Sequence, residues 1–405
     1  MRMGNRQKMN KPIDIIAFFL LALLTAVPFR EGLFDNAIVG AGQDVVSTLW
    51  GMWWLQMEGL GALFGKNTTL VNFPYGSVGI VLAPSSAILW GFFEPIMGIG
   101  RAMAFVCWLQ ILAVVYATVW LASLMAIEKP WHWVAGLAIV VARFFFYATG
   151  EASLVAMIAV GIPIGIGALI QMQREEAWLP WGILLVVSAI WLAFENPYLA
   201  PALPGITLLF ALYFKEKRGR FFLALALMSM GIMSIASAYS ASANPNYPRE
   251  VAGKTAYVLG HNWKIVDLPW ARLKLSELWF PSEVSWTTNT QNAILAKGGR
   301  YIGVSILLLA FYGGVDRRMK WFAALALACI LVSMGSVQEN IAYPFIFVNA
   351  LMDAISRPLT QPTRFLVISI IALSICAAWG VNKIAHRSRL AATAIVALIF
   401  FDGVV

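Results

Sequence analysis

The stretch Ile13-Asp-Ile-Ile-Ala-Phe-Phe-Leu-Leu-Ala-Leu-Leu-Thr-Ala-Val27 is the first of a series of long apolar runs, and these runs decide the fold. A helix that crosses a bilayer needs about 20 mostly apolar residues, so a run of this kind predicts a membrane span. The segment before it is basic, with Arg2, Arg6, Lys8 and Lys11. This charge favours a cytoplasmic N-terminus. The following Pro28-Phe-Arg-Glu31 is a poor signal-peptide cleavage site, so we expect an uncleaved span.

The composition of the whole chain points to the same class. The 405 residues are 60% hydrophobic and only 12% charged, which is more apolar surface than a soluble protein of this size could bury. The formal net charge is +9, but the Lys and Arg residues are spread between apolar runs, as the positive-inside rule expects. We therefore predict an all-α polytopic membrane protein that binds no nucleic acid.

Apolar length and basic flanks together predict about eleven spans in a single transmembrane domain, 1–405. The predicted spans are 13–28, 103–127, 131–149, 153–171, 178–194, 199–214, 221–240, 300–315, 321–336, 365–381 and 390–404. The stretch 79–100 is also apolar, but a further span there would invert every later loop and place the basic clusters outside. Its prolines, Pro84 and Pro95, also weaken a straight helix. We therefore predict that this stretch is re-entrant or lies in the outer interface.

With this topology the cytoplasmic loops are short and basic, and the longer loops all lie outside. The outer segments are the first outer loop 29–102 with its interfacial helices, the long loop 243–299, and the loop 337–364 with an arginine pair. Short outer turns contain Glu151 and Glu195. We therefore expect function to be concentrated at the outer face.

Asp44 is the first candidate for chemistry at that face. It begins an amphipathic segment in which Trp50, Trp53 and Trp54 follow at helical spacing. Asp44 either caps this helix or acts as a general base or metal-anchoring carboxylate that faces a lipid-borne substrate. The tryptophans fit an interfacial belt, and Trp50 and Trp54 are also candidates for stacking on a sugar.

Two further acids lie in the predicted outer turns. Glu151 follows Arg143, an arginine inside a predicted span, where a charge is costly unless it pairs or lines a wet cavity. The two residues either form a structural ion pair, or Arg143 binds a phosphate and Glu151 serves as a second acid. Glu195 is either an exposed turn acid or an inward-facing residue of a substrate site.

Arginine and histidine residues of the later outer loops are candidates for phosphate binding. Arg357 and Arg364 lie beside the predicted span 365–381 and either snorkel to the interface or grip a phosphate in the bidentate way that arginine favours. His261 in the loop 243–299 could contact a sugar or a phosphate, although a lone loop histidine is more often incidental.

These features together resemble bacterial multi-spanning glycosyltransferases of the GT-C fold, including the YfhO-like group. The resemblance rests on Gly42-Gln43-Asp44 with Trp50 and Trp54, on Asn72-Phe-Pro-Tyr-Gly76 followed by Glu94-Pro95, and on Arg357-Pro358 with Pro362-Thr-Arg-Phe365. It covers most of the chain in order, through short and degenerate motifs. Many relatives have glycine where this chain has Gln43, and a paired acidic motif where it has the lone Glu151.

The resemblance implies transfer of a sugar from a polyprenyl-phosphate donor at the periplasmic face of a bacterial inner membrane. Asp44 matches the catalytic acid of the first outer loop, and Glu151 matches the second acid. A divalent metal ion is a candidate cofactor, and membrane lipids and an unidentified glycan, lipid or protein acceptor are the implied partners. Relatives often carry a soluble C-terminal domain, so acceptor recognition is expected to be missing here or supplied by a partner subunit.

Two other classes of function stay open. A transporter or lipid flippase would favour midplane charges, broken helices and repeat symmetry; Gly161-Ile-Pro-Ile-Gly-Ile-Gly167 hints at a broken helix, but no repeat is visible. A non-catalytic membrane subunit of a larger assembly is the third class. Function that survives replacement of both acids would favour it.

Overall fold

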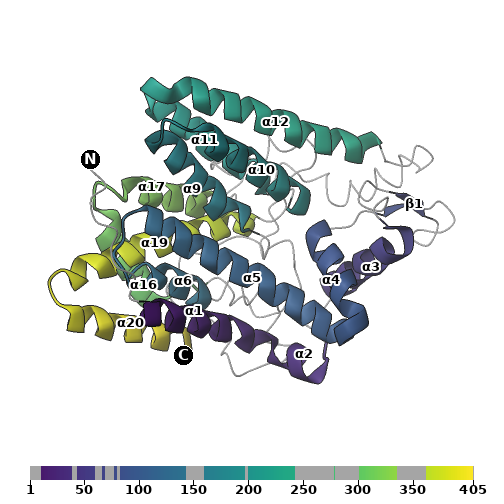
Figure 1. The fold of residues 1–405 in the computed structure, drawn as a ribbon, viewed down its shortest axis with the longest axis horizontal. Coiled ribbons are helices and arrows are strands. Elements are labelled where there is room, and N and C mark those ends of the chain that lie inside the picture. Colours follow the sequence, from purple (N-terminus) through teal and green to yellow (C-terminus); the bar gives the residue numbers. More distant parts are fainter. Residues whose placement is uncertain are drawn as a thin grey trace.

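The computed structural model describes residues 11–38, 43–59, 66–68, 77–79, 83–142, 159–196, 199–241, 278, 301–334 and 362–404, and all structural statements concern these residues. They are almost entirely helical (Figure 1). Within them, four helices are long and apolar enough to cross a bilayer: Pro12–Asp35, Ile99–Leu124, Lys215–Ile235 and Leu366–Ala385. The prediction of an all-α protein with membrane-spanning helices is thereby confirmed.

The N-terminal part of the chain contains the first span and the first outer loop. Its elements are α1 (Lys11–Ala26), the 3₁₀ turn η1 (Val27–Phe29), α2 (Arg30–Asp35), α3 (Gln43–Glu58), the antiparallel strands β1 (Lys66–Thr68) and β2 (Ser77–Gly79), α4 (Pro84–Met97) and α5 (Ile99–Leu124).

The stretch 79–100 is more helical than its prolines suggest. Pro84 is the first residue of α4, where its missing N–H group is not needed, and Pro95 lies in the last turn. The break comes instead at Gly98, which has a φ of 85° and a ψ of 163°. A helix that turns back at Gly98 into α5 fits an interfacial or re-entrant element.

The rest of the chain adds further helices, and a described helix overlaps each of the eleven predicted spans. The elements are α6 (Trp133–Val141), α9 (Gly161–Arg174), α10 (Leu179–Glu195), α11 (Ala202–Tyr213), η4 (Lys215–Lys217), α12 (Arg218–Ala241), α16 (Val304–Gly314), α17 (Lys320–Ser333), η7 (Pro362–Phe365), α19 (Leu366–Ala385) and α20 (Arg389–Val404). Of these, α10, α11, α16 and α17 are apolar but have fewer than 18 residues.

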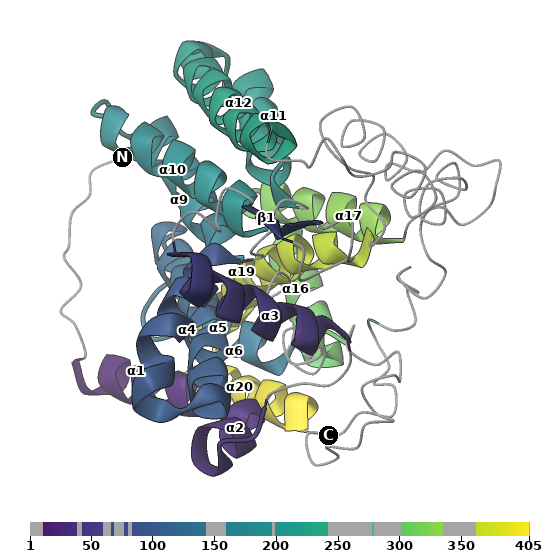
Figure 2. The ribbon, with the colours of Figure 1, turned by 90° about the vertical axis from the view of Figure 1, so that its right-hand side faces the viewer.

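The core of the molecule forms around α19, which packs against α16, α17, α6 and α20 (Figures 1 and 2). In the most apolar 18-residue stretch of α19, 83% of the residues are buried. In the corresponding stretch of Lys215–Ile235, which contains most of α12, the share is 17%. Gly313 of α16 and Gly380 of α19 allow the two backbones to touch, because a Cβ atom at either position would overlap a carbonyl oxygen of the other helix. Small residues serve the same purpose between helices in membranes.

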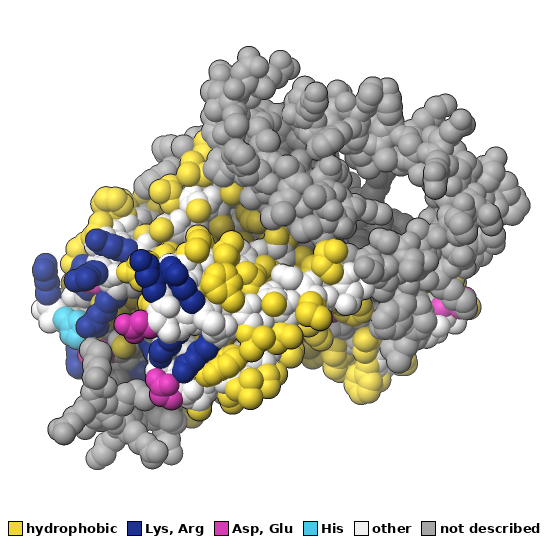
Figure 3. All heavy atoms as spheres, turned by 90° about the horizontal axis from the view of Figure 1, so that it is seen from above, with side chains coloured by type: hydrophobic (Ala, Val, Ile, Leu, Met, Phe, Trp, Pro, Cys, Tyr) yellow, Lys and Arg dark blue, Asp and Glu magenta, His cyan; other side chains and the backbone are white. Residues whose placement is uncertain are grey.

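One end of the bundle gathers Lys and Arg side chains (Figure 3), and we call it the basic end. It comprises the start of α1 and the segments 124–133, 173–181, 211–220, 312–321 and 382–389. Two ion pairs join these segments, Lys129 to Asp14 at 3.1 Å and Lys383 to Asp316 at 4.0 Å, and His386 Nε2 lies 3.7 Å from the Glu128 carboxylate. The loops that the sequence predicts on one side of the membrane therefore lie together.

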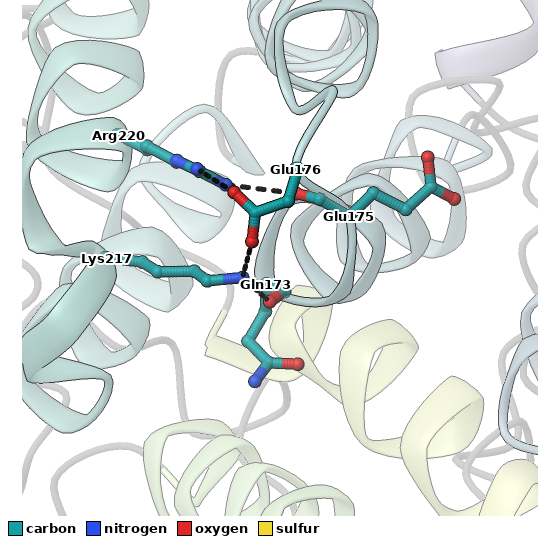
Figure 4. Close-up of polar contacts among 5 residues, drawn as sticks. All are labelled: Gln173, Glu175, Glu176, Lys217 and Arg220. Carbon is teal, nitrogen blue, oxygen red and sulfur yellow. Dashed lines mark hydrogen bonds and ion pairs between the residues drawn. The ribbon is translucent and has the colours of Figure 1, made fainter. Parts of the chain in front are cut away.

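A second cluster at the basic end ties the turn between α9 and α10 to the start of α12 (Figure 4). Arg220 Nη2 lies 3.0 Å from Glu176 Oε2, and Lys217 Nζ lies 3.7 Å from Glu176 Oε1. Lys217 also donates to the Gln173 carbonyl at 2.7 Å, and Arg220 to the Glu175 carbonyl at 3.0 Å. The hydrogen bond from Arg220 and the charge of Lys217 lower the pKa of Glu176. Since Glu176 is exposed, these ion pairs contribute little to stability.

The other end of the bundle, which we call the docking end, comprises α2, α3, α4, the start of α5 and the end of α10. Asn36 follows α2 and accepts a hydrogen bond from the backbone N–H of Arg101 at 2.9 Å. Gly100 allows this approach, because a Cβ atom there would overlap the Asn36 carbonyl oxygen. The first outer loop is thus fixed to the helix that follows it.

Asp402 closes the contact between the end of α20 and the start of α16. Its carboxylate accepts hydrogen bonds from the Tyr301 hydroxyl, from the Ser305 hydroxyl at 2.6 Å and from the Ser305 backbone N–H at 2.8 Å. Both of its oxygens therefore have partners. Asp402 therefore caps the first turn of α16.

Candidate functional site at the docking end

The helices of the first outer loop pack on each other and on the bundle. The buried face of α3 is formed by Met52, Trp54 and Leu55 and lies against α4. Gln56 of α3 donates to Glu94 of α4 at 3.5 Å. In this way α3, the helix whose second residue is Asp44, is carried by α4.

Two hydrogen bonds, one buried and one partly buried, tie α4 to two helices of the bundle. Gln110 of α5 donates its amide N–H to the Ser86 hydroxyl at 3.1 Å. The Ser85 backbone N–H donates to Oε1 of Glu195, the last residue of α10, at 2.7 Å. Ser85 and Glu195 are 110 positions apart, so this bond is a tertiary contact between the first outer loop and a later turn.

Glu195 is fully buried, with no exposed surface. Its second oxygen, Oε2, makes no hydrogen bond to any residue that the structure describes. A buried carboxyl with one free oxygen is unusual, since most buried polar atoms have a partner. Glu195 is therefore not an exposed turn acid; that it is an inward-facing residue of a substrate site remains a prediction.

Glu195 also caps the start of α4, which has no capping side chain of its own. The first backbone N–H groups of a helix need acceptors from outside the helix, and a Ser, Thr, Asp or Asn side chain usually provides one. Here the residue before α4 is Ala83, in left-handed conformation with φ 55° and ψ 61°, and it makes no side-chain cap. The carboxyl of Glu195 caps the helix in its place.

Burial controls the charge of Glu195. The residue is the last of α10, one position beyond the predicted span 178–194, and burial raises its pKa from 4.5 to about 7. The Ser85 backbone N–H and hydroxyl act in the opposite direction but more weakly. The carboxyl therefore gains or loses its proton close to neutral pH.

The tryptophans of α3 differ in exposure. Trp54 is 3% exposed and stacks on the half-buried Trp50, with ring centroids 5.6 Å apart and an interplanar angle of 9°. Trp53 presents its ring outward and is 40% exposed. The packing of Trp50 and Trp54 is explained by the contact of α3 with α4, and their predicted stacking on a sugar remains a prediction.

Of the remaining predicted site residues, the structure describes Arg364 alone. Arg364 lies half-buried in η7, directly before α19. Arg143, Glu151, His261 and Arg357 lie outside the described residues.

No group of three His, Cys, Asp or Glu side chains forms a metal site among the residues that the structure describes. Glu151 and His261 are outside that set, and so is the side chain of Asp44. The predicted divalent ion therefore remains a prediction.

Sequence reasoning missed the polar residues that hold α4, namely Ser85, Ser86 and Gln110. A signal for the first two was present, because Pro84-Ser-Ser is a typical helix start with proline at the first helical position. Gln110 gave no such signal, because a single polar residue in an apolar run does not reveal its partner.

No protein-family model matches this chain, and no curated protein matches it either.

Proposed function

We propose that this protein is a membrane glycosyltransferase that moves a sugar from a polyprenyl-phosphate donor to an acceptor at the outer face of a bacterial inner membrane. The observation that carries the proposal is the docking of the first outer loop on the bundle. Through α4, it brings the helix that contains Asp44 to the same end as the buried acid Glu195. The basic end lies away from both, as expected if the two ends face opposite sides of the membrane.

The proposal includes a topology of about eleven spans with a cytoplasmic N-terminus. Its support is the arrangement of the helix ends: the polar contacts at the basic end join the start of α1 to the ends of α5, α16 and α19. Each of these contacts joins segments that the positive-inside rule assigns to the cytoplasm. The docking end then faces the periplasm.

In the proposed reaction an acceptor hydroxyl attacks the anomeric carbon of the donor sugar. Asp44 takes the proton from this hydroxyl while the new bond between carbon and oxygen forms. The bond from the anomeric carbon to the phosphate oxygen breaks, and the polyprenyl phosphate leaves with the electron pair. Arg143, Arg357 and Arg364 are the proposed partners of the phosphate charge, a role that suits the planar guanidinium group. Glu151 is the proposed second acid.

The proposal is tested with purified protein in liposomes of bacterial lipid, supplied with radiolabelled polyprenyl-phosphate hexoses and membrane extract as the acceptor source. The released polyprenyl phosphate and the labelled product are measured. Loss of a general base typically costs about 10²–10⁴ in rate, so Asp44→Asn should lower turnover by at least about a hundredfold. Asp35→Asn, which changes an exposed acid at the end of α2, is the matched control. Full turnover by Asp44→Asn would contradict the proposal.

The glycine-rich run 161–167, which hinted at a broken helix, forms the first half of α9. The helix α9 runs without a break over Gly161–Arg174. Its glycines serve packing, since a Cβ atom at Gly165 would meet Leu203 and one at Gly161 would approach the Ser188 carbonyl. Transfer of the labelled lipid between leaflets without release of its sugar would nevertheless favour a flippase over a glycosyltransferase.

A further inference from the structure

The contact between Glu195 and Ser85 joins α4 of the first outer loop to α10 of the bundle. On one side, α4 carries α3 through their packed faces and through the Gln56–Glu94 hydrogen bond. On the other side, the Glu195 carboxyl is part of α10, which packs firmly against α9 and α12 of the bundle. The 2.7 Å bond therefore connects the unit that contains Asp44 to α10, in addition to the packing of α4 on α5 and the Gln110–Ser86 bond.

We infer that Glu195 is a positioning residue that sets the place of the α3–α4 pair, and with it Asp44, relative to the bundle. It does so by capping the first turn of α4 from a distant part of the chain. The consequence for turnover rests on the proposed glycosyltransferase function, whereas the docking role rests on the geometry alone.

The hydrogen bond needs only an acceptor at the Oε1 position, which separates this role from chemistry on a substrate. Glutamine has the same shape, and its amide oxygen accepts the Ser85 N–H just as the carboxyl does. Alanine leaves that partly buried N–H without its carboxyl partner, and an unpaired donor shielded from water is costly. Glu195→Gln should therefore keep the docking, and Glu195→Ala should lose it. If the carboxyl acted directly on a substrate, both variants would lose turnover.

A second pair of variants removes the same bond from the other partner and provides a control. Ser85→Pro deletes the N–H donor in the first turn of α4, a place where helices tolerate proline. It should behave like Glu195→Ala although Glu195 is intact. Glu94→Gln changes an acid of α4 that contacts α3 and not α10, so it should behave like the wild type.

The test measures docking and turnover separately. Spin labels are placed on the exposed positions Met57 of α3 and Ile183 of α10 by Met57→Cys and Ile183→Cys, which are 64% and 56% exposed in the wild type. The native thiols, Cys107, Cys329 and Cys376, are all buried and are replaced by alanine. Pulsed electron paramagnetic resonance then reports the distribution of distances in liposomes, and the release of polyprenyl phosphate reports kcat and KM.

We expect Glu195→Ala and Ser85→Pro to broaden the distance distribution. Since misplacement of a catalytic group by about 1 Å can cost about a hundredfold, we expect their kcat to fall by roughly that factor while KM stays within about twofold. Glu195→Gln and Glu94→Gln should keep the distribution and the kcat of the wild type.

Two results would overturn the inference. One is a wild-type distance distribution in both Glu195→Ala and Ser85→Pro. The other is a Glu195→Gln variant with wild-type distances but the low kcat of Glu195→Ala, because the carboxyl would then act on the substrate itself. Failure of the proposed function looks different: the wild type would release no polyprenyl phosphate, while the distances still respond to Glu195→Ala.

Discussion

At the basic end, acids and bases tie the loops together through several ion pairs, whereas at the docking end the buried carboxyl of Glu195 accepts one backbone hydrogen bond. Glu176 at the basic end is 87% exposed at its side chain and pairs with both Arg220 and Lys217. Glu195 at the docking end has no exposed surface and a single hydrogen-bond partner among the described residues. The contacts of Glu176 are therefore exposed and multiple, whereas Glu195 is buried and makes one hydrogen bond among the described residues.

The two ends should differ most in how strongly a glycine-to-alanine substitution lowers the free energy of unfolding. A Cβ atom at Gly100 of the docking end would overlap backbone atoms of Asn36. Backbone atoms cannot move aside as the end of a flexible side chain can. We expect Gly100→Ala to lower the free energy of unfolding by about 3 kcal/mol, the upper range for overpacking. At the basic end, Gly219 of α12 has no atom within 4 Å of its Cβ position, so Gly219→Ala should be neutral or slightly stabilising. Thermal unfolding in detergent, followed by tryptophan fluorescence, measures both; equal midpoints for the two variants would refute the contrast.

The next largest effect concerns the buried carboxyl. Glu195→Ala leaves the Ser85 N–H unpaired and should lower the free energy of unfolding by about 1–3 kcal/mol. Glu195→Gln keeps the bond and, at a pH below 4.5, where the wild-type carboxyl is protonated, should unfold close to the wild-type midpoint. The same thermal assay decides the point, and identical losses in the two variants would show that the charge, and not the hydrogen bond, matters for stability.

The two ends should also respond to pH in opposite directions. Burial raises the pKa of Glu195 from 4.5 in the unfolded chain to about 7, so the folded protein binds the extra proton between these values. The contribution of protonated Glu195 to the free energy of unfolding is fully present below pH 4.5 and is lost as the pH rises through 7. The pKa of Glu176 is lowered from 4.5, so its contribution is present above that pH and is lost on acidification. Unfolding midpoints from pH 4 to 9 test this: a pKa raised from 4.5 to about 7 corresponds, at 1.36 kcal/mol per pKa unit, to a loss of about 3 kcal/mol for the wild type relative to Glu195→Gln as the pH rises. A difference that does not change with pH would contradict the raised pKa.

The smallest effect is expected from the ion pairs of the basic end. Glu176→Gln removes the partner of both Arg220 and Lys217, but these cations keep their bonds to the carbonyl oxygens of Glu175 and Gln173. Exposed pairs contribute little and are screened by salt. The thermal midpoint should therefore change less than in any of the variants above, and the change should vanish at high salt. A loss as large as that of Glu195→Ala would make the two ends equivalent.

Much of this fold follows from the apolar runs, because a chain in lipid must satisfy its backbone hydrogen bonds within helices. The helices α10 and α20 begin and end within about one residue of the predicted spans 178–194 and 390–404. The break at Gly98 was harder to predict, since two prolines nearby are stronger signals in the sequence but occupy positions that a helix tolerates.

The site could be predicted less well than the fold. The sequence singles out Glu195 as an acid in an outer turn, but it does not show that a serine 110 positions earlier is its partner. Such a contact depends on how α4 lies across α10, which no local pattern encodes. Asp44 illustrates the same limit: its helix was predicted from the spacing of the tryptophans, but its packing on α4 was not.

The most direct measurement is the sidedness of the two ends in a membrane. In the cysteine-free background, Ala37→Cys places a thiol at an exposed position of the docking end, and Glu216→Cys places one at an exposed position of the basic end. A membrane-impermeant maleimide is applied to spheroplasts before and after permeabilisation. Labelling of position 37 in intact spheroplasts, with labelling of position 216 only after permeabilisation, is the predicted result. Labelling of both positions from the same side would contradict an active docking end that faces the periplasm.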